Sequence, residues 1–192
     1  MRIAIFSGSF NPIHNGHLAI AREVLAQGAA DELWFLVSPL NPLKKNTDLW
    51  PENDRLEMVK LAIENEHGIK ASDFEFHLPR PTYTIDTLKN LKINFPQNQF
   101  LLLIGGDNLA IFHKWFEYQK IIHEFGLIVY PRPGFKQENL PQFSNTTLIS
   151  APLIDLSATE IRKKLANGES IADMVPKKVN SFLHQHMTNP GN

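Results

Sequence analysis

The chain has 192 residues, which is near the upper end of a single domain and short for two. It is 43% hydrophobic and 20% charged, as expected for a globular protein with a sizeable core. A net charge of −1 argues against broad electrostatic binding to a nucleic-acid polymer or an anionic membrane. The lack of cysteine excludes disulfides, thiol catalysis and cysteine-ligated zinc. Since no leader-like segment or long apolar run is apparent, we expect a cytoplasmic protein with one domain over residues 1–187 and a loose tail at 188–192.

Strand-like and helix-like segments alternate along the chain. An apolar run predicts a first strand at 2–6, and a helix with one apolar face follows it over 18–27. Further apolar or alternating runs predict strands at 32–37, 73–77, 100–104, 127–130 and 147–149. Helical spacing predicts helices around 56–63, from Thr84 onward, over 158–167 and over about 177–186, with long loops at 39–51 and 135–145.

This alternation predicts an α/β fold, namely a Rossmann-like doubly wound parallel sheet with helices on both faces and a small C-terminal helical part. In such sheets, ligands bind beyond the carboxyl ends of the strands. The polar segments of this chain that begin at Ser7, Ser38 and Gly105, and the turn before Ser157, all follow predicted strands. The sequence therefore predicts one shared site at that edge of the sheet.

The N-terminal segment GSFNPIHNGH joins the first strand to the first helix through a small-residue turn. A strand, a glycine turn and a helix N-terminus direct backbone N–H groups and a positive dipole end toward one place. His14 and His17 stand three positions apart at the start of that helix. Two imidazoles beside free N–H groups favour a triphosphate ligand, so we expect a nucleotide site here.

A second polar segment opens the helix predicted at 158–167. Ser157 and Glu160 have the spacing of a capping box, which is sufficient to explain a well-capped helix. Thr159 falls in the first turn and Arg162 about one turn later, so hydroxyls, N–H groups and a guanidinium surround the same helix end.

The two segments resemble the two signatures of the nucleotidylyltransferase superfamily. The first fits the pattern G-x-F-x-P-x-H-x-G-H, and the second fits I-S-S-T-x-I-R except that Ala158 replaces the second serine. Three further segments are similar to bacterial nicotinate-nucleotide adenylyltransferases: YTIDTL at 83–88, GGDNL at 105–109 followed by Trp115, and NPLK at 41–44, where leucine replaces the family's histidine. An R-P-G segment begins at Arg132, so the resemblance covers residues 2 to about 165.

The resemblance implies that the phosphate of nicotinate mononucleotide attacks the α-phosphorus of ATP, giving nicotinate adenine dinucleotide (deamido-NAD) and pyrophosphate in NAD biosynthesis. It implies catalytic roles for His14, His17, Lys44 and Arg162. The implied ATP-binding residues are Gly8, Ser9, Phe10, His14, His17, Gly105, Asp107, Ser157, Thr159 and Arg162. The implied mononucleotide-binding residues are Ser9, Phe10, Lys44, Tyr83, Thr84, Asp107, Trp115 and Arg132.

The resemblance also implies Mg²⁺ with ATP, coordinated mostly by phosphate oxygens and water, and we find no protein cage for it in the sequence. The charge state of the two histidines is left open, because a helix N-terminus lowers the pKa of an imidazole while a nearby triphosphate raises it. Arg55 could simply pair with a neighbouring carboxylate. The remaining histidines are read as ordinary surface or helix residues: His67, His77, His113, His123, His184 and His186.

Four alternatives remain at this stage. The acceptor could be nicotinamide mononucleotide, which side-chain identity does not separate from nicotinate mononucleotide. Phosphopantetheine adenylyltransferases carry both signatures, but typically have threonine at the position of His14 and lack the 83–88 segment. Cytidylyltransferases share the two histidines but lack the segment with Trp115. A non-catalytic nucleotide sensor is disfavoured because both signatures keep their functional side chains.

Overall fold

The computed structural model describes residues 1–39, 49–132, 145–152 and 156–186. The strands are β1 (Arg2–Gly8), β2 (Glu32–Val37), β3 (Ile69–Ser72), β4 (Gln99–Gly105), β5 (Leu127–Tyr130) and β6 (Thr146–Leu148). The α-helices are α1 (Asn15–Ala26), α2 (Glu52–Ile63), α3 (Thr84–Asn94), α4 (Gly106–Ala110), α5 (Tyr118–Glu124), α6 (Ala158–Ala166) and α7 (Lys177–His186). Two short 3₁₀ helices are η1 (Phe74–His77) and η2 (Phe112–Lys114). No helix among these residues is long and apolar enough to cross a membrane.

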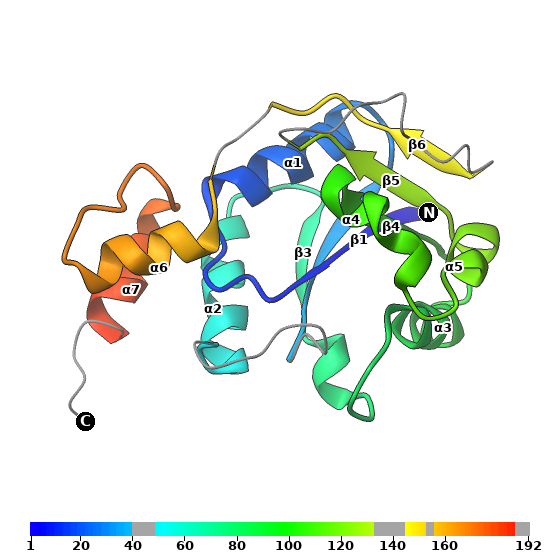
Figure 1. Cartoon of the computed structure of the whole chain (residues 1–192), viewed down its shortest axis with the longest axis horizontal. Coiled ribbons are helices and arrows are strands. Elements are labelled where there is room, and N and C mark those ends of the chain that lie inside the picture. The colour runs from blue at the N-terminus through cyan, green and yellow to red at the C-terminus, as the bar shows by residue number, and fades with distance from the viewer. Residues whose placement is uncertain (40–48, 133–144, 153–155, 187–192) are drawn as a thin grey trace.

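The strands form one parallel sheet in the order β3-β2-β1-β4-β5-β6. From β1 the chain winds outward to β2 and β3, and then returns to the other side of β1 to add β4, β5 and β6 (Figure 1). The direction of winding reverses between β1 and β4, which is where sheets of this kind bind ligands. The predicted doubly wound α/β fold is confirmed.

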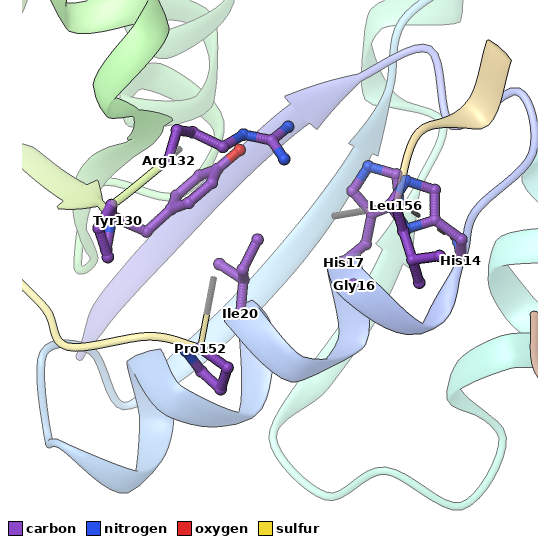
Figure 2. Close-up of a pocket in the computed structure, with 9 residues that line it drawn as sticks. His14, Gly16, His17, Ile20, Tyr130, Arg132, Pro152 and Leu156 are labelled. Atoms are coloured by element: carbon purple, nitrogen blue, oxygen red, sulfur yellow. Dashed lines mark hydrogen bonds between the residues drawn. The ribbon is translucent and has the colours of Figure 1, made fainter. Parts of the chain in front are cut away.

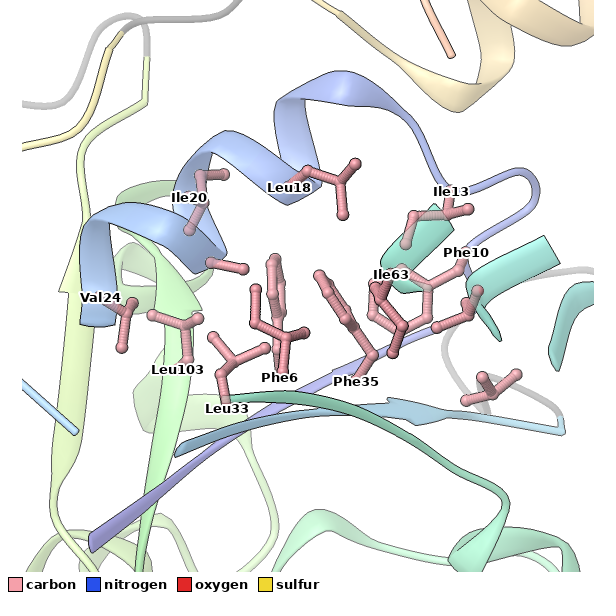
Figure 3. Packing of buried hydrophobic residues seen from close by; sticks show 14 of the residues in the cluster. Phe6, Phe10, Ile13, Leu18, Ile20, Val24, Leu33, Phe35, Ile63 and Leu103 are labelled. Carbon is pink, nitrogen blue, oxygen red and sulfur yellow. The ribbon is translucent and has the colours of Figure 1, made fainter. Parts of the chain in front are cut away.

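Alternate residues of β1 point to opposite faces of the sheet, as the pleat requires. Ala4 and Phe6 belong to a core covered by α1 and α2, whereas Ile3 and Ile5 belong to a second core covered by α3 and α5. Figure 3 shows the first core, where Phe6 and Phe35 stack beneath α1 with ring centroids 5.4 Å apart. Burial on both faces explains why the central strands have nearly continuous apolar sequences.

The C-terminal helices pack on the same side as α1 and α2. Ile161 of α6 and Val179 and Leu183 of α7 are buried in the first core. The segment between these two helices also holds the beginning of α1, because Asn15 donates its backbone N–H to Met174 O (2.9 Å) and its side-chain amide to Asp173 O (2.9 Å). The end of the chain is thereby tied to the histidine motif near its beginning.

Most predicted elements are confirmed, but the strand predicted at 73–77 is wrong. That segment is η1, and the strand, β3, lies just before it at Ile69–Ser72. The alternation of phenylalanine and glutamate over 74–76 is typical of a strand that buries its phenylalanines. In the structure Glu75 is the buried residue, while Phe74 and Phe76 are only partly buried. The sequence also did not predict α4 and α5, and α1 begins at Asn15 rather than at residue 18. The tail predicted at 188–192 lies outside the described residues.

Candidate active site

The turn after β1 is shaped by the contact between Gly8 and Phe10. A Cβ atom on Gly8 would lie 3.0 Å from the Phe10 ring, so glycine lets that ring fold back over the strand end without a tight contact. Phe10 itself has a φ of 45°, a left-handed conformation that costs a non-glycine residue energy. Burial of its ring against Phe6 and Phe35 compensates for this strain. The turn is therefore held by packing, which explains the G-x-F spacing.

His14 and His17 stack on each other where α1 begins. Their ring centroids are 3.7 Å apart with planes at 25° (Figure 2). The backbone N–H of His14 donates to His17 Nδ1 (3.3 Å), so this nitrogen is an acceptor and Nε2 carries the proton of a neutral ring. His14 is only 4% exposed, and its Nδ1 has no hydrogen-bond partner within the described part of the chain.

The surroundings of the two rings favour their neutral forms. Burial, together with the positive charge of Arg132, lowers the pKa of His14 to about 4. Burial lowers the pKa of His17 well below its ordinary value, and His14 and Arg132 lower it further. Both shifts favour the neutral imidazole in the free protein, and the charge state beside a triphosphate stays open. An anion that neutralised Arg132 would raise both pKa values.

A small cavity lies beside the imidazoles. Arg132 crosses it from the end of β5, with its guanidinium 5.5 Å from the Tyr130 ring centroid and its Nε 3.8 Å from Asp107 Oδ1. Figure 2 shows the guanidinium extending toward the histidines. The residues lining the cavity are His14, Gly16, His17, Ile20, Tyr130, Pro131, Arg132, Pro152 and Leu156.

The second signature reaches the first through Arg162. Its Nη1 donates to Asn11 O (2.8 Å), a carbonyl in the loop between Phe10 and His14, and its Nη2 lies 3.5 Å from Thr159 Oγ1. Ser157 Oγ accepts from the backbone N–H of Glu160 (3.1 Å), so the predicted cap of α6 is confirmed. A guanidinium 151 positions along the chain from the histidine loop thus lies beside it.

A larger cavity of about 470 Å³ opens on the opposite side of the β1 and β4 ends. Its apolar wall includes Trp115, and its rim includes the rings of Tyr83 and Phe116, whose centroids are 4.8 Å apart. The first turn of α3, at Thr84, also opens into it, and the first N–H groups of a helix have no partner within the helix. Tyr130 lines both cavities, so they meet at the centre of the sheet edge.

Several predicted site residues line one of these two cavities, whereas five described ones line neither: Phe10, Asp107, Ser157, Thr159 and Arg162. Gly8, Ser9 and Gly105 line the larger cavity together with the residues just described. Asp107 lies next to Gly105, where an added Cβ would come within 2.4 Å of Asp107 Oδ1, so the glycine makes room for the carboxylate. Arg132, predicted to bind the mononucleotide, instead lies in the small cavity with the histidines. Lys44 and the rest of the 41–44 segment lie outside the described residues.

Sequence reasoning did not find the role of Arg55. This guanidinium is fully buried and donates to four backbone carbonyls: Trp50 O (2.9 Å), Ser9 O (2.6 Å), Ser38 O (2.8 Å) and Pro39 O (3.1 Å). Burial lowers its pKa to about 10, where it still carries its charge at neutral pH. The arginine thereby joins the loops that follow β1 and β2. Local sequence gave no signal for it, because its main partners are backbone carbonyls.

A second missed residue is Glu75, which is 6% exposed in the wall of the larger cavity. Its Oε1 accepts from Thr87 Oγ1 (3.0 Å) and from Ser7 Oγ (3.4 Å), and Ser38 also donates to the carboxylate. Burial raises the pKa of Glu75, while these hydroxyl donors act in the opposite direction. Glu75 therefore joins β1, the β2 end and α3 from the opposite side to Arg55.

Comparison with known proteins agrees with this geometry. Residues 5–164 match the family described as cytidylyltransferase-like. A protein of Bacteroides fragilis named as a probable nicotinate-nucleotide adenylyltransferase is 48% identical over 170 residues, which cover 88% of this chain and 85% of that protein. One of the same name from Cytophaga hutchinsonii is 45% identical and covers 95% of both chains. This chain belongs to the nicotinate-nucleotide adenylyltransferase family.

The fold of this adenylyltransferase is also found in solved structures. Nicotinic acid mononucleotide adenylyltransferase of Plasmodium falciparum, solved in complex with NaAD, superposes with a TM-score of 0.80. The superposition covers 96% of this chain and 95% of the other at 24% identity. At that identity the likeness supports the fold, and family membership rests on the closer relatives.

The buried histidine predicts a specific loss of stability in acid. The pKa of His14 is lowered from 6.5 to about 4 by folding, so between these pH values the unfolded chain binds more protons than the folded one. The free energy of unfolding should therefore fall by about 3 kcal/mol from this group as pH drops from 7 to 4. We expect urea unfolding of His14→Gln to lose less stability than the wild type over this range. Equal losses in the two proteins would contradict the low pKa.

Proposed function

We propose that this protein transfers the adenylyl group of ATP to nicotinate mononucleotide, producing deamido-NAD and pyrophosphate in NAD biosynthesis. The observation that carries the proposal is the pair of cavities that meet at the β1 and β4 ends. One is lined by two imidazoles and a guanidinium, and the other by a tryptophan, a tyrosine and a helix N-terminus. The first has a volume of only about 10 Å³, so we propose that its imidazoles and guanidinium bind phosphate oxygens at its mouth. The second, of about 470 Å³, has room for an aromatic mononucleotide. The names of the relatives supply the same reaction independently.

The chemistry needs positioning and positive charge rather than a nucleophilic side chain. The phosphate of the mononucleotide is already an anion, so it can attack the α-phosphorus in line without a general base. We assign His14 and His17 to the α-phosphate, where the Nε2–H of His17 is available as a donor. Both rings favour the neutral form before ATP binds. The negative phosphates would raise the pKa of each ring, and the imidazoles would then stabilise the charge that develops on the phosphate.

The leaving pyrophosphate needs its own ligands. We assign this role to Arg162, with Ser157 and Thr159 at the N-terminus of α6 and with Lys44 from the 39–51 segment. Arg162 already lies against the histidine loop through its bond to Asn11 O. Exchange of that carbonyl for a phosphate oxygen would need little movement of the α6 end.

ATP enters as its Mg²⁺ complex in this proposal. Mg²⁺ retains several waters and binds one or two carboxylates plus substrate phosphates in most nucleotide sites. Within the described residues no group of three or more histidine, aspartate or glutamate side chains could hold the ion. We propose, as the resemblance implies, that the phosphates and water supply most of its coordination, so that the ion belongs to the substrate.

The mononucleotide occupies the larger cavity. Trp115 offers a flat surface for the pyridine ring, and the α3 start at Tyr83 and Thr84 offers backbone N–H groups to a carboxylate. Asp107 is assigned to ribose hydroxyls, since its carboxylate folds back against Gly105 at the end of β4. Arg132 lies nearer the histidines than this cavity, so we assign it to the phosphate shared by the two substrates.

The substrate assignment is tested by pyrophosphate release from ATP with a panel of acceptors. Nicotinate mononucleotide should give the highest kcat/KM, followed by nicotinamide mononucleotide, because only the former presents a carboxylate to the α3 N-terminus. Phosphopantetheine and cytidylyl acceptors should give no release. A preference for phosphopantetheine would replace the proposed acceptor, and no release with any acceptor would indicate a nucleotide sensor.

The assignment of the imidazoles is tested by His17→Ala. Loss of one charge-stabilising donor should lower kcat by about 10² or more, while an unchanged far-ultraviolet circular-dichroism spectrum shows that the variant is folded. His67→Ala, at an exposed position remote from both cavities, provides the matched control and should keep wild-type kinetics. Undiminished turnover in His17→Ala would remove this residue from the mechanism.

A further inference from the structure

The larger cavity contains an acidic residue that the reaction as described does not use. Among its described lining residues, one is acidic and one is basic: Glu75 in the buried wall and Lys114 at the exposed side. A carboxylate in the wall of a cavity that receives a phosphorylated, anionic substrate is unfavourable unless it serves a purpose. Its burial makes the cost larger, because screening by water is weak there.

Glu75 is held in place by hydrogen bonds, and these oppose the effect of burial, which raises the pKa of its carboxyl group. Hydroxyl donors from Ser7, Ser38 and Thr87 converge on the carboxylate, and a hydroxyl that donates stabilises the ionised form. These donors come from three separate elements, so the carboxylate has a fixed position relative to the strand ends. The structure thus holds a carboxyl group at a fixed position in the wall of the cavity that we assign to the mononucleotide, where a bound cation would favour its ionised form.

The chemistry of the acceptor explains why such a charge is useful. A pyridine ring joined to ribose through its nitrogen is a pyridinium and carries a full positive charge. Nicotinate mononucleotide therefore presents a zwitterionic head, with a cationic ring and an anionic carboxylate. The charged pair lining the cavity, one carboxylate and one ammonium, has the complementary composition.

We propose that Glu75 is a specificity-determining residue whose carboxylate recognises the cationic pyridinium ring of the acceptor. It thereby favours the oxidised mononucleotide over its 1,4-dihydro form, whose ring is neutral and of similar size. This inference rests on the proposed function, because it needs the ring to occupy the larger cavity. The Trp115 ring also favours the oxidised form, since an aromatic surface attracts a cation.

The test compares kcat/KM for nicotinate mononucleotide and for its 1,4-dihydro form, with ATP saturating, at pH 8. The wild type should prefer the oxidised acceptor. Glu75→Gln keeps the size and an acceptor oxygen for the hydroxyls but removes the charge, so the ratio of the two kcat/KM values should fall by about tenfold. Should the glutamine variant not fold, Glu75→Met serves for the same measurement.

Thr82→Val is the matched control, because Thr82 lines the same cavity but carries no charge, and its hydroxyl donates to Pro79 O rather than to Glu75. Its ratio of oxidised to dihydro activity should stay near that of the wild type, even if both rates fall. The inference is overturned if the wild type shows no preference, if Glu75→Gln keeps the wild-type ratio, or if Thr82→Val lowers the ratio equally. Absence of wild-type pyrophosphate release with either acceptor would instead contradict the proposed function.

Discussion

The burial of two stacked imidazoles at the beginning of α1 is the constraint on which the site depends. Rings 3.7 Å apart with little access to water cannot both carry charge, and the His14 N–H bond to His17 Nδ1 requires that the second ring be neutral. The free protein therefore holds an uncharged pair beside the Arg132 guanidinium. In the proposed function, binding of a triphosphate would bring negative charge to the pair and raise the pKa of both rings, so the site would gain positive charge only with its substrate bound.

The rest of the fold holds that pair in place. Reversal of the winding between β1 and β4 leaves the ends of these strands open, and glycines at positions 8 and 105 let side chains fold back over them. Two buried charged residues then fix the adjoining loops from opposite sides. Arg55 donates hydrogen bonds to carbonyls that follow β1 and β2. Glu75 accepts hydrogen bonds from hydroxyls in β1, after β2 and in α3. Each compensates its own burial with several hydrogen bonds, as buried ions must.

Much of this could be predicted from sequence, because the informative features are local. The histidine motif, the Ser157 cap and the apolar runs of β2, β4 and β5 each depend on residues a few positions apart. The failures involve contacts that are distant in sequence. Glu75 stands between two phenylalanines that mimic a strand, and only its bond to Thr87 in α3 reveals why the acidic residue is buried. No local pattern indicated that Arg55 is buried, because its partners are backbone carbonyls. The place of Arg132 in the small cavity follows from the pairing of β5 with β4, which is a contact between segments distant in sequence.

The most direct test of the account follows the two imidazoles by NMR. Proteins labelled with ¹⁵N-histidine, titrated with and without a non-hydrolysable ATP analogue, would report the pKa and tautomer of His14 and His17 separately. In the free protein we expect both pKa values to lie well below 6.5, with His17 protonated on Nε2, and both should rise when the analogue binds. An ordinary pKa for either ring in the free protein, or pKa values unmoved by the analogue, would contradict the account.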